Sequence, residues 1–295
     1  MIVPEHDLAK LQEILASAGQ AAIAVSGGVD SMTLAIVAHR LAPARTHIFH
    51  ATSPAVPELA TDRVRDFAAR EGWDLNVIDA GEFQDPEYRA NPADRCYFCK
   101  RGLYGGILKA LQAGAEHALM AGTNLDDLGD FRPGLLAAEQ KNVRHPFVEA
   151  GMTKSQVRAV AAHLGLQELA ELAAAPCLAS RVETGLAIDG DELRKIDRVE
   201  VALRANLKEM GLRARAVRCR VLSTGIELAL DTACLDALDA ASRARLLVKA
   251  QRAWGQPAPS MKWSAYQMGQ TFFPSAETRA RYASSRVQVT PAESR

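Results

Sequence analysis

The sequence offers little that would assign the protein to a membrane, a secretory route or a nucleic acid. No apolar run approaches the roughly 20 residues that a membrane helix needs. Lysine plus arginine and aspartate plus glutamate both number 35, so the formal net charge is zero and gives no overall attraction to nucleic acid. The first residues lack a basic region followed by an apolar core, and we therefore expect no signal peptide.

Cysteine is also scarce, with 5 residues in a chain of 295. In a chain of this size without a signal peptide, cysteines indicate a reducing cytoplasm, and paired cysteines favour metal binding or chemistry over disulfides. A Walker A loop is missing, because no Gly-Lys-Ser/Thr follows a glycine-rich turn. The apolar content of 48% and the charged content of 24% are those of a globular protein, and the length allows two domains.

Strand and helix patterns alternate through the first part of the chain. Strand-like runs lie at 21–25, 46–52, 75–79 and 117–121, and helical spacing lies at 8–18, 32–41, 58–71 and 98–111. This alternation predicts a parallel, doubly wound α/β sheet. Its ligand is expected beyond the carboxyl ends of the strands, where Ser26 and Gly122 both fall.

The pattern changes in the second half of the chain. A capping box at 153–156 predicts a helix that runs to 163. Further on we expect a helix at 192–210, strands at 213–221 and 225–231 joined by 222–224, and a helix at 235–254. We therefore divide the chain into a larger domain at 1–186 and a smaller α+β domain at 187–295, whose last dozen residues are expected to be mobile.

The turn after the first strand carries the clearest chemical signal. Its six residues are Ser26, Gly27, Gly28, Val29, Asp30 and Ser31. Glycines let a backbone approach a phosphate closely, and a helix N-terminus presents N–H groups to anionic oxygens. The serines add hydroxyl donors, and Asp30 can hold magnesium against the phosphates. The turn resembles the PP-loop of ATP pyrophosphatases, which cut ATP between the α and β phosphates; an ordinary glycine turn is the alternative.

A second polar cluster follows the strand at 117–121. Its members are Gly122, Thr123, Asn124, Asp126, Asp127, Asp130 and Arg132. Oxygen ligands suit magnesium, which keeps some water and would neutralise charge on a departing pyrophosphate, and the arginine could add a phosphate contact. The alternative is a helix cap made by Asn124 or Asp126. Which of the three aspartates binds metal is left open at this point.

Three cysteines lie in polar surroundings. Cys96 and Cys99 form a CxxC motif flanked by cations, and Cys177 follows a proline. Cations beside a thiol lower its pKa, so we expect reactive thiolates. Three thiolates suit a 4Fe–4S cluster with one open iron, whereas zinc would want a fourth soft ligand that no second CxxC or histidine pair supplies. Packing is the alternative for Cys177, and it is the expected role of Cys219 and Cys234.

Five segments together resemble the LarE family of ATP-dependent sulfur transferases. They span 26–31, 91–100, 122–134, 149–154 and 177–181, and they fall in the family's order. The resemblance covers 21–185 well and is vaguer afterwards. It implies a PP-loop fold, also called adenine nucleotide alpha hydrolase-like, for the domain at 1–186, and it implies ATP and Mg²⁺ as cofactors.

The resemblance also implies a reaction. Family members adenylylate a carboxylate of a pyridinium carboxylate mononucleotide and release pyrophosphate, and a sulfur then displaces AMP on the way to the nickel-pincer cofactor. In some members the cysteine that matches Cys177 gives up its own sulfur. In others, cysteines that match Cys96, Cys99 and Cys177 hold a 4Fe–4S cluster that delivers sulfide. This chain has all three, which favours the cluster route.

The residues expected to act in such a reaction fall into three groups. The catalytic group is Cys177, Asp30, Ser180 and Arg181. The group that binds nucleotide or substrate is Ser26, Gly27, Gly28, Val29, Asp30, Ser31, Gly122, Thr123, Asn124, Arg218 and Arg220. The metal-binding group is Cys96, Cys99 and Cys177 for the cluster, and Asp30, Asp127 and Asp130 for magnesium. Arg218 and Arg220 lie two residues apart on the predicted strand at 213–221 and therefore share one face. In the family, a similar arginine pair binds a substrate phosphate. A solvated strand face is the alternative.

Two segments depart from the family pattern. The run 182–185 lacks the aromatic residue that usually precedes the glycine, and the tail around 254–273 is long. Both departures bear on the prediction of the acceptor substrate more than on the prediction of ATP chemistry. The competing interpretations are a tRNA thiolase, an amide-forming ligase of the same fold and a non-enzymatic nucleotide-binding regulator. Neutral charge argues against tRNA, and an amide ligase would not need three thiols. We expect a small-molecule substrate and a homo-oligomer.

Overall fold

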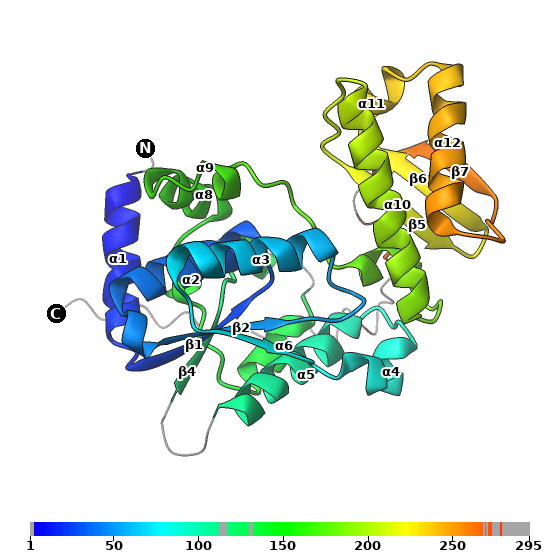
Figure 1. Cartoon of the computed structure of the whole chain (residues 1–295). Helices are drawn as coiled ribbons and strands as arrows, with labels where there is room; N and C mark the ends of the chain where they lie inside the picture. The colour runs from blue at the N-terminus through cyan, green and yellow to red at the C-terminus, as the bar shows by residue number, and fades with distance from the viewer. Residues whose placement is uncertain are drawn as a thin grey trace.

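A four-stranded parallel sheet forms the centre of the larger part of the molecule (Figure 1). The computed structural model describes residues 3–111, 117–129, 132–267, 269, 271–272 and 278. The strand order is β3–β2–β1–β4, and each neighbouring pair is parallel. The strands are β1 (Gln20–Val25), β2 (Thr46–Ala51), β3 (Leu75–Ile78) and β4 (His117–Ala121). The predicted α/β, doubly wound class is confirmed, and the arrangement is consistent with the PP-loop fold.

Helices cover both faces of this sheet. One face carries α1 (Pro4–Ala16), α2 (Val29–Leu41), α3 (Glu58–Glu71), α8 (Lys154–His163) and α9 (Gln167–Ala170), and the other carries α5 (Arg95–Ala110) and α6 (Gly134–Glu139). Successive side chains of a strand point to opposite faces, so Ile23 and Val25 join the core under α2 while Ala22 and Ala24 join the core under α5. Burial on both faces explains why β1 is apolar from Ala21 to Val25.

Short elements connect these layers. They are α4 (Pro86–Arg89), α7 (Pro146–Glu149) and the 3₁₀ turns η1 (Pro43–Arg45), η2 (Glu82–Gln84), η3 (Leu125–Gly129) and η4 (Leu178–Arg181). The capping box predicted for α8 is confirmed: the Thr153 side chain accepts from the Gln156 backbone N–H, and the Gln156 side chain accepts from the Thr153 backbone N–H. In the described ranges, no helix combines the length and apolar character that a membrane span requires.

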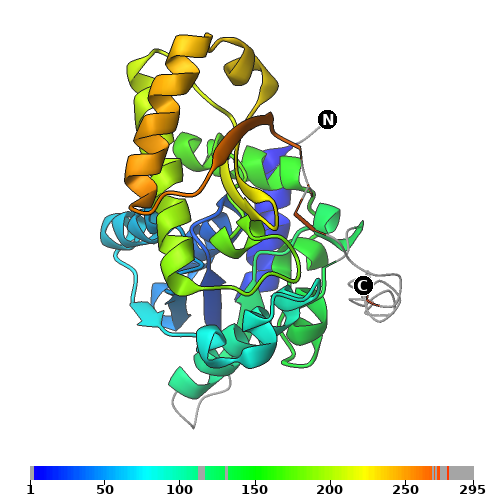
Figure 2. The ribbon, with the colours of Figure 1, turned by 90° about the vertical axis from the view of Figure 1, so that its right-hand side faces the viewer.

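A small mixed sheet forms the C-terminal part of the molecule. It has the order β5–β6–β7, with β5 (Val217–Leu222) and β6 (Gly225–Leu230) antiparallel and β7 (Met261–Ala265) parallel to β6. The helices α10 (Gly190–Glu209), α11 (Thr232–Asp236) and α12 (Ala240–Trp254) accompany it. Figure 2 shows β7 in dark orange beside β6 in yellow, with α10 and α12 next to them.

Three sequence predictions for this part need correction. The first strand begins at Val217 and not at 213, because the backbone N–H groups of Arg215 and Ala216 donate to the Asp231 carboxylate at 2.7 and 3.2 Å instead of entering the sheet. The helix predicted at 235–254 is two helices, since Asp239 caps α12 by accepting from the Ser242 N–H at 2.7 Å. Strand β7 was not predicted at all. The expectation of a mobile tail falls outside the described residues.

The second hydrophobic core crosses from one part of the molecule to the other. Its C-terminal members come from α10, β5, β6 and α12. Tyr88, Phe98 and Leu178, which belong to α4, α5 and η4, are buried in the same core. The small sheet is therefore fastened by apolar contact to the segments that carry the predicted cysteines.

Candidate active site

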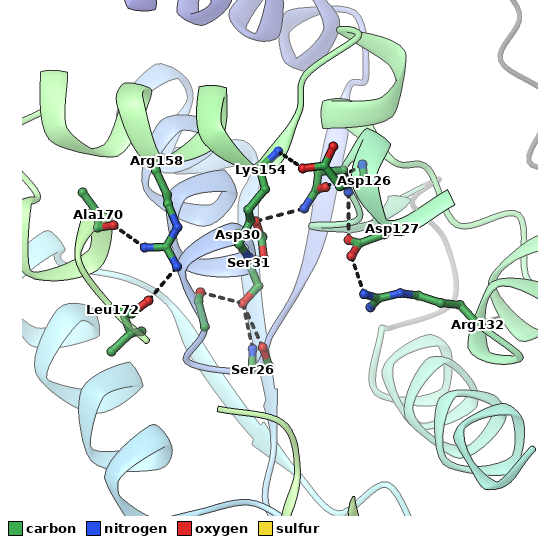
Figure 3. A network of polar contacts seen from close by, with 12 residues as sticks. Ser26, Asp30, Ser31, Asp126, Asp127, Arg132, Lys154, Arg158, Ala170 and Leu172 are labelled. Carbon is green, nitrogen blue, oxygen red and sulfur yellow. Dashed lines mark hydrogen bonds and ion pairs between the residues drawn. The ribbon is translucent and has the colours of Figure 1, made fainter. Parts of the chain in front are cut away.

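The glycine-rich turn lies between β1 and α2, as predicted. The Ser31 hydroxyl accepts from the Ser26 N–H at 3.0 Å, lies 3.2 Å from the Ser26 hydroxyl and donates to the Gly28 carbonyl at 3.3 Å (Figure 3). These bonds hold the turn in one shape. Gly28 is the N-cap of α2 and provides no side-chain acceptor for the first N–H groups of the helix. Such N–H groups, together with the helix dipole, attract an anion such as a phosphate.

Two glycines are required by close backbone contacts at this turn. Gly27 has a φ of +75°, and a Cβ atom there would lie 2.6 Å from the Ala60 carbonyl oxygen of α3. A Cβ atom on Gly122, just after β4, would lie 2.7 Å from the Ser31 nitrogen. The end of β4 therefore touches the first turn of α2. The two predicted nucleotide-binding segments meet at the carboxyl edge of the sheet.

The Asp30 carboxylate is shared by two other segments. The Asn124 side-chain amide donates to its Oδ1 atom at 3.2 Å, and the Lys154 ammonium group forms an ion pair with its Oδ2 atom (Figure 3). Lys154 is the first residue of α8, and sequence reasoning gave it no role beyond the capping box. A signal was present, because a cation at a helix N-terminus is unfavourable and implies an anionic partner.

The second polar cluster is folded around Asn124. The Asn124 side-chain oxygen accepts from the Asp126 backbone N–H at 3.0 Å and so caps the turn η3. The Asn124 backbone N–H donates to the Asp127 carboxylate at 3.1 Å. Asp127 also pairs with Arg132 at 2.7 Å. The capping role is therefore taken by Asn124, while its phosphate-side role stays a prediction. Thr123 lies between Gly122 and this cap, and Asp130 falls outside the described residues.

These carboxylates fit magnesium in part. The described ranges contain no group of three or more histidine, cysteine, aspartate or glutamate side chains arranged to hold a metal ion. Asp30 and Asp127 nevertheless bond the same residue, Asn124, through different atoms. Magnesium on a nucleotide needs one or two protein carboxylates, with the remaining ligands supplied by phosphate oxygens and water. Asp30 and Asp127 match that number of carboxylates, although each is paired with a cation, Lys154 and Arg132 respectively.

The three predicted sulfur residues come from two segments. Cys96 and Cys99 lie in the first turns of α5, three residues apart and hence on one face, and Cys177 directly precedes η4. Cys96 and Cys177 are exposed and Cys99 is half-buried. Cys177 acts electrostatically on both other thiols, but among the described residues no three histidine, cysteine, aspartate or glutamate side chains are arranged to hold a metal ion. Three thiolates are the number that a 4Fe–4S cluster with one open iron takes from a protein.

The expectation that cations activate these thiols is wrong for Cys96 and Cys99. Burial of the Cys99 sulfur raises the pKa of that thiol. The charge of Cys177 raises the pKa of both thiols, whereas Lys100 lowers both and Arg95 lowers that of Cys96. Arg95 is buried and directs its guanidinium to the Asn91 side chain at 3.0 Å. The surroundings therefore favour the thiol over the thiolate at both positions, and a bound metal would favour the thiolate. Cys219 and Cys234 are buried, which confirms their packing role.

The residues after Cys177 hold its backbone in place. The Ser180 hydroxyl donates to the Cys177 carbonyl at 2.7 Å, and Arg181 Nη1 donates to the same carbonyl at 3.2 Å. Arg181 is 2% exposed and forms a two-pronged ion pair with Glu200 of α10 at 2.9 Å. The Leu178 N–H donates to the Ala55 carbonyl at 2.8 Å, which joins this loop to the segment after β2. Ser180 and Arg181, predicted as catalytic, thus act on the position of Cys177.

Arg218 and Arg220 lie on one face of β5, as their spacing predicts, but neither lies on a solvated face. They are 6% and 4% exposed. Arg218 donates to the Ala174 carbonyl at 3.0 Å, three residues before Cys177, and Arg220 pairs with Glu227 at 3.2 Å. Among the described residues around β5, the buried arginines outnumber the buried glutamates. The arginines are Arg181, Arg218 and Arg220, and the glutamates are Glu200 and Glu227. An excess of buried positive charge favours an anionic ligand.

A cavity of about 850 Å³ lies between the two parts of the molecule. One wall is the segment after β2, from Thr52 to Glu58, and the opposite wall is α10. Leu178, next to Cys177, also lines it. Its volume is within the range of small-molecule sites. Arg194 and Arg198 line the α10 wall of this cavity. The sequence analysis gave them no role, because residue spacing does not show which face of a helix borders a cavity.

Known proteins resemble this chain over about two thirds of its length. No protein-family model matches it. It is 34% identical over 203 residues to uncharacterized protein slr1717 of Synechocystis sp., covering 68% of this chain and 74% of that protein. It is 28% identical over 186 residues to uncharacterized protein MJ0830 of Methanocaldococcus jannaschii, covering 63% and 70%. It is 26% identical over 184 residues to the pyridinium-3,5-bisthiocarboxylic acid mononucleotide synthase of Lactiplantibacillus plantarum, covering 62% and 66%. The chain therefore belongs to the same family as slr1717, and its distant similarity to the synthase supports the LarE family.

Proposed function

We propose that this protein is an ATP-dependent sulfur transferase that acts on a carboxylate of a pyridinium carboxylate mononucleotide, in the synthesis of a nickel-pincer cofactor. The relative from Lactiplantibacillus plantarum is named for a thiocarboxylic product of this class. The observation that carries the proposal is the bond from the Leu178 N–H to the Ala55 carbonyl. It joins the loop of Cys177 to the carboxyl edge of the sheet, where the glycine-rich turn lies.

The first step is adenylylation of the substrate. A carboxylate is a poor acyl donor because its leaving group would be oxide. In the proposed step a carboxylate oxygen forms a bond to the α-phosphorus of ATP, and the bond from that phosphorus to the bridging oxygen breaks, so that pyrophosphate leaves. The N–H groups of the turn at 26–31 and the Lys154 ammonium group bind the departing charge. Asp30 and Asp127 would hold Mg²⁺, which supplies further neutralisation when bound.

The second step is transfer of sulfur to the activated carbonyl. In the sacrificial form, the Cys177 sulfur bonds to the acyl carbon as AMP leaves. Removal of the Cys177 α-proton then breaks its Cβ–Sγ bond, which leaves a thiocarboxylate on the substrate and dehydroalanine in the chain. In the other form, Cys96, Cys99 and Cys177 would hold a 4Fe–4S cluster, which supplies sulfide when bound. In both forms Ser180 and Arg181 fix the Cys177 backbone.

The two buried arginines of β5 are the proposed binding site for the substrate phosphate. The excess positive charge around them supports this assignment. Their link to the Cys177 loop through the Ala174 carbonyl supports it as well. A substrate held by its phosphate at Arg218 and Arg220 then presents its carboxylate toward the sulfur residues.

The test is acceptor-dependent formation of AMP and pyrophosphate by anaerobically purified protein. Ser26→Ala and Asp30→Ala should each lower the rate of AMP formation about 10²–10³-fold, because each removes a group proposed to stabilise the negative charge that develops on the departing pyrophosphate. Ser17→Ala and Asp74→Ala are the matched controls, since both side chains lie away from the site. Near-normal turnover in both site variants, or AMP formation with tRNA or ammonia alone as acceptor, would contradict the proposal. Iron and sulfide content before turnover, and loss of the elements of hydrogen sulfide from Cys177 after it, distinguish the two sulfur sources.

A further inference from the structure

Tyr266, the first residue after β7, lies against both arginines of the proposed phosphate site. Its backbone N–H donates to the Leu230 carbonyl at 2.7 Å, which continues the pairing of β7 with β6. Its ring lies 5.4 Å from the Arg218 guanidinium carbon and 5.3 Å from that of Arg220. One aromatic ring therefore contacts two buried cations. Figure 2 shows the strand that delivers it at the edge of the small sheet.

Two adjacent buried guanidiniums repel one another, so something must hold them together. Glu227 lies within 3.2 Å of Arg220, and Arg218 donates to carbonyl oxygens of Val217 and Ala174 at 2.9 and 3.0 Å. The negative face of an aromatic ring attracts cations within about 6 Å of its centre. Tyr266 meets that condition for both side chains at once. A ring shared in this way fixes the position of each guanidinium relative to the other.

We propose that Tyr266 is a positioning residue that holds Arg218 and Arg220 as a single two-armed binding site for the phosphate of the acceptor nucleotide. This inference rests on the proposed function and extends it to the tail after Gly255, which departs from the LarE pattern. Phosphate oxygens are bound most strongly by guanidinium donors of fixed spacing. The tyrosine contributes by fixing that spacing, without touching the substrate.

The same tail also reaches the loop of Cys177. The carbonyl oxygen of Gln267 accepts from Arg220 Nη2. Further along, the Thr271 hydroxyl donates to the Ser180 carbonyl at 2.8 Å, and the Thr184 N–H donates to the Thr271 carbonyl at 3.0 Å. One segment is therefore bonded both to the phosphate-binding arginines and to the loop that carries the sulfur. This arrangement sets the distance between the phosphate end and the reacting end of a bound acceptor.

The experiment compares two acceptors and two substitutions. The acceptors are a pyridinium biscarboxylate mononucleotide and the same compound without its phosphate. Tyr266→Phe keeps the ring, and Tyr266→Leu replaces it with a smaller apolar side chain. We expect Tyr266→Leu to raise the KM for the mononucleotide about tenfold, the effect of losing a desolvated cation–π contact, with Tyr266→Phe within about twofold of the native protein. The KM for the compound without phosphate and the Kd for ATP should not change.

The outcomes separate the inference from the proposal beneath it. A KM for the mononucleotide that stays unchanged in Tyr266→Leu overturns the inference. So does an equal rise for both acceptors, which indicates a structural defect that thermal unfolding would also reveal. If Arg218→Ala and Arg220→Ala raise the KM for the mononucleotide while Tyr266→Leu does not, the phosphate site stands and the tyrosine has no part in it. If the native protein forms no AMP with either acceptor, the proposed function itself fails.

Discussion

Lys154 shows how one side chain can prepare a site for an anion. Its ammonium group lies at the positive end of the α8 dipole, which costs about 0.3–1 kcal/mol at an exposed helix start. The Asp30 carboxylate, at the start of α2, offsets that cost. The two side chains are 34% and 21% exposed, so solvent and ligands reach the pair. In the proposed reaction, a triphosphate at the turn would compete with Asp30 for the lysine, and magnesium would compete with the lysine for Asp30.

Replacement of Lys154 by alanine tests this role. We expect AMP formation to fall about 100-fold, since a cation aimed at the leaving pyrophosphate is lost, and we expect the Kd for ATP to rise. Lys109→Ala is the matched control, because Lys109 is an exposed lysine at the end of α5. Initial rates and ATP titrations of the three proteins provide the measurement. ATP binding that is equal or tighter in Lys154→Ala would mean that the lysine only neutralises Asp30.

For individual residues, the sequence predicts where a residue lies in the fold better than it predicts which side chains surround it. The turn at 26–31 and the strand end at 122–124 meet as their place after parallel strands requires, because the carboxyl ends of such strands share one edge. The thiol environment could not be obtained in this way. Arg95 is next to Cys96 in the chain, but its side chain is buried and turned to Asn91. Burial and direction of a side chain depend on packing partners distant in sequence.

Among the helices and strands, the close approach of β4 and α2 has the largest consequence for the site. At Gly122 the backbone of one element touches the backbone of the other, because a Cβ atom there would lie 2.9 Å from both the Asp30 carbonyl carbon and the Ser31 Cα. Neither atom belongs to a flexible side chain that could move aside. The N-terminal turn of α2 is therefore held against the end of β4, which fixes the N–H groups that we propose bind phosphate.

Gly122→Ala should disturb both stability and nucleotide binding. Forcing a methyl group against backbone atoms typically costs about 1–3 kcal/mol, and the displaced turn should weaken ATP binding. Gly105→Ala is the matched control in α5, since a Cβ atom there meets nothing within 4 Å and alanine in a helix gains about 0.5–1 kcal/mol over glycine. Urea unfolding and ATP titration measure the two effects. The packing argument is wrong if the two substitutions change the free energy of unfolding alike.

The predictions of elements failed where tertiary pairing, rather than local pattern, decides the structure. The first helices and strands were found because their apolar spacing is regular. Strand β7 contains only one buried residue, Met261, and it exists because β6 offers a parallel edge for pairing. The break between α11 and α12 depends on Asp239, whose carboxylate captures the Ser242 N–H. That capping signal was present in the sequence and outweighs the helical spacing around it.

At the scale of the whole molecule, the two parts share a core. Tyr88, Phe98 and Leu178 belong to the proposed domain at 1–186, yet they are buried with the helices and strands of the proposed domain at 187–295. The buried pair of Arg181 and Glu200 also crosses that boundary, and Glu200 accepts the Cys219 N–H at 3.0 Å. Breaking such a pair by removing one partner typically costs about 3–5 kcal/mol. The proposed boundary therefore divides the chain by topology, while the packing joins its two sides.

This shared core predicts that the two parts unfold together. Chains well above 150 residues often unfold in separate steps, but separation here would expose Tyr88, Phe98 and Leu178 to water. Trp73 lies in the core of the parallel sheet, and Trp254 and Trp263 pack in or against the second core, so single-tryptophan variants report on each part. We expect coincident urea transitions from both reporters. Phe98→Ala removes a buried ring of α5 and should lower both midpoints by a similar amount, for a loss of about 3–5 kcal/mol. Two separate transitions, with only the Trp254 signal moved by the substitution, would show that the cores are independent and that the fragment 1–186 can fold alone.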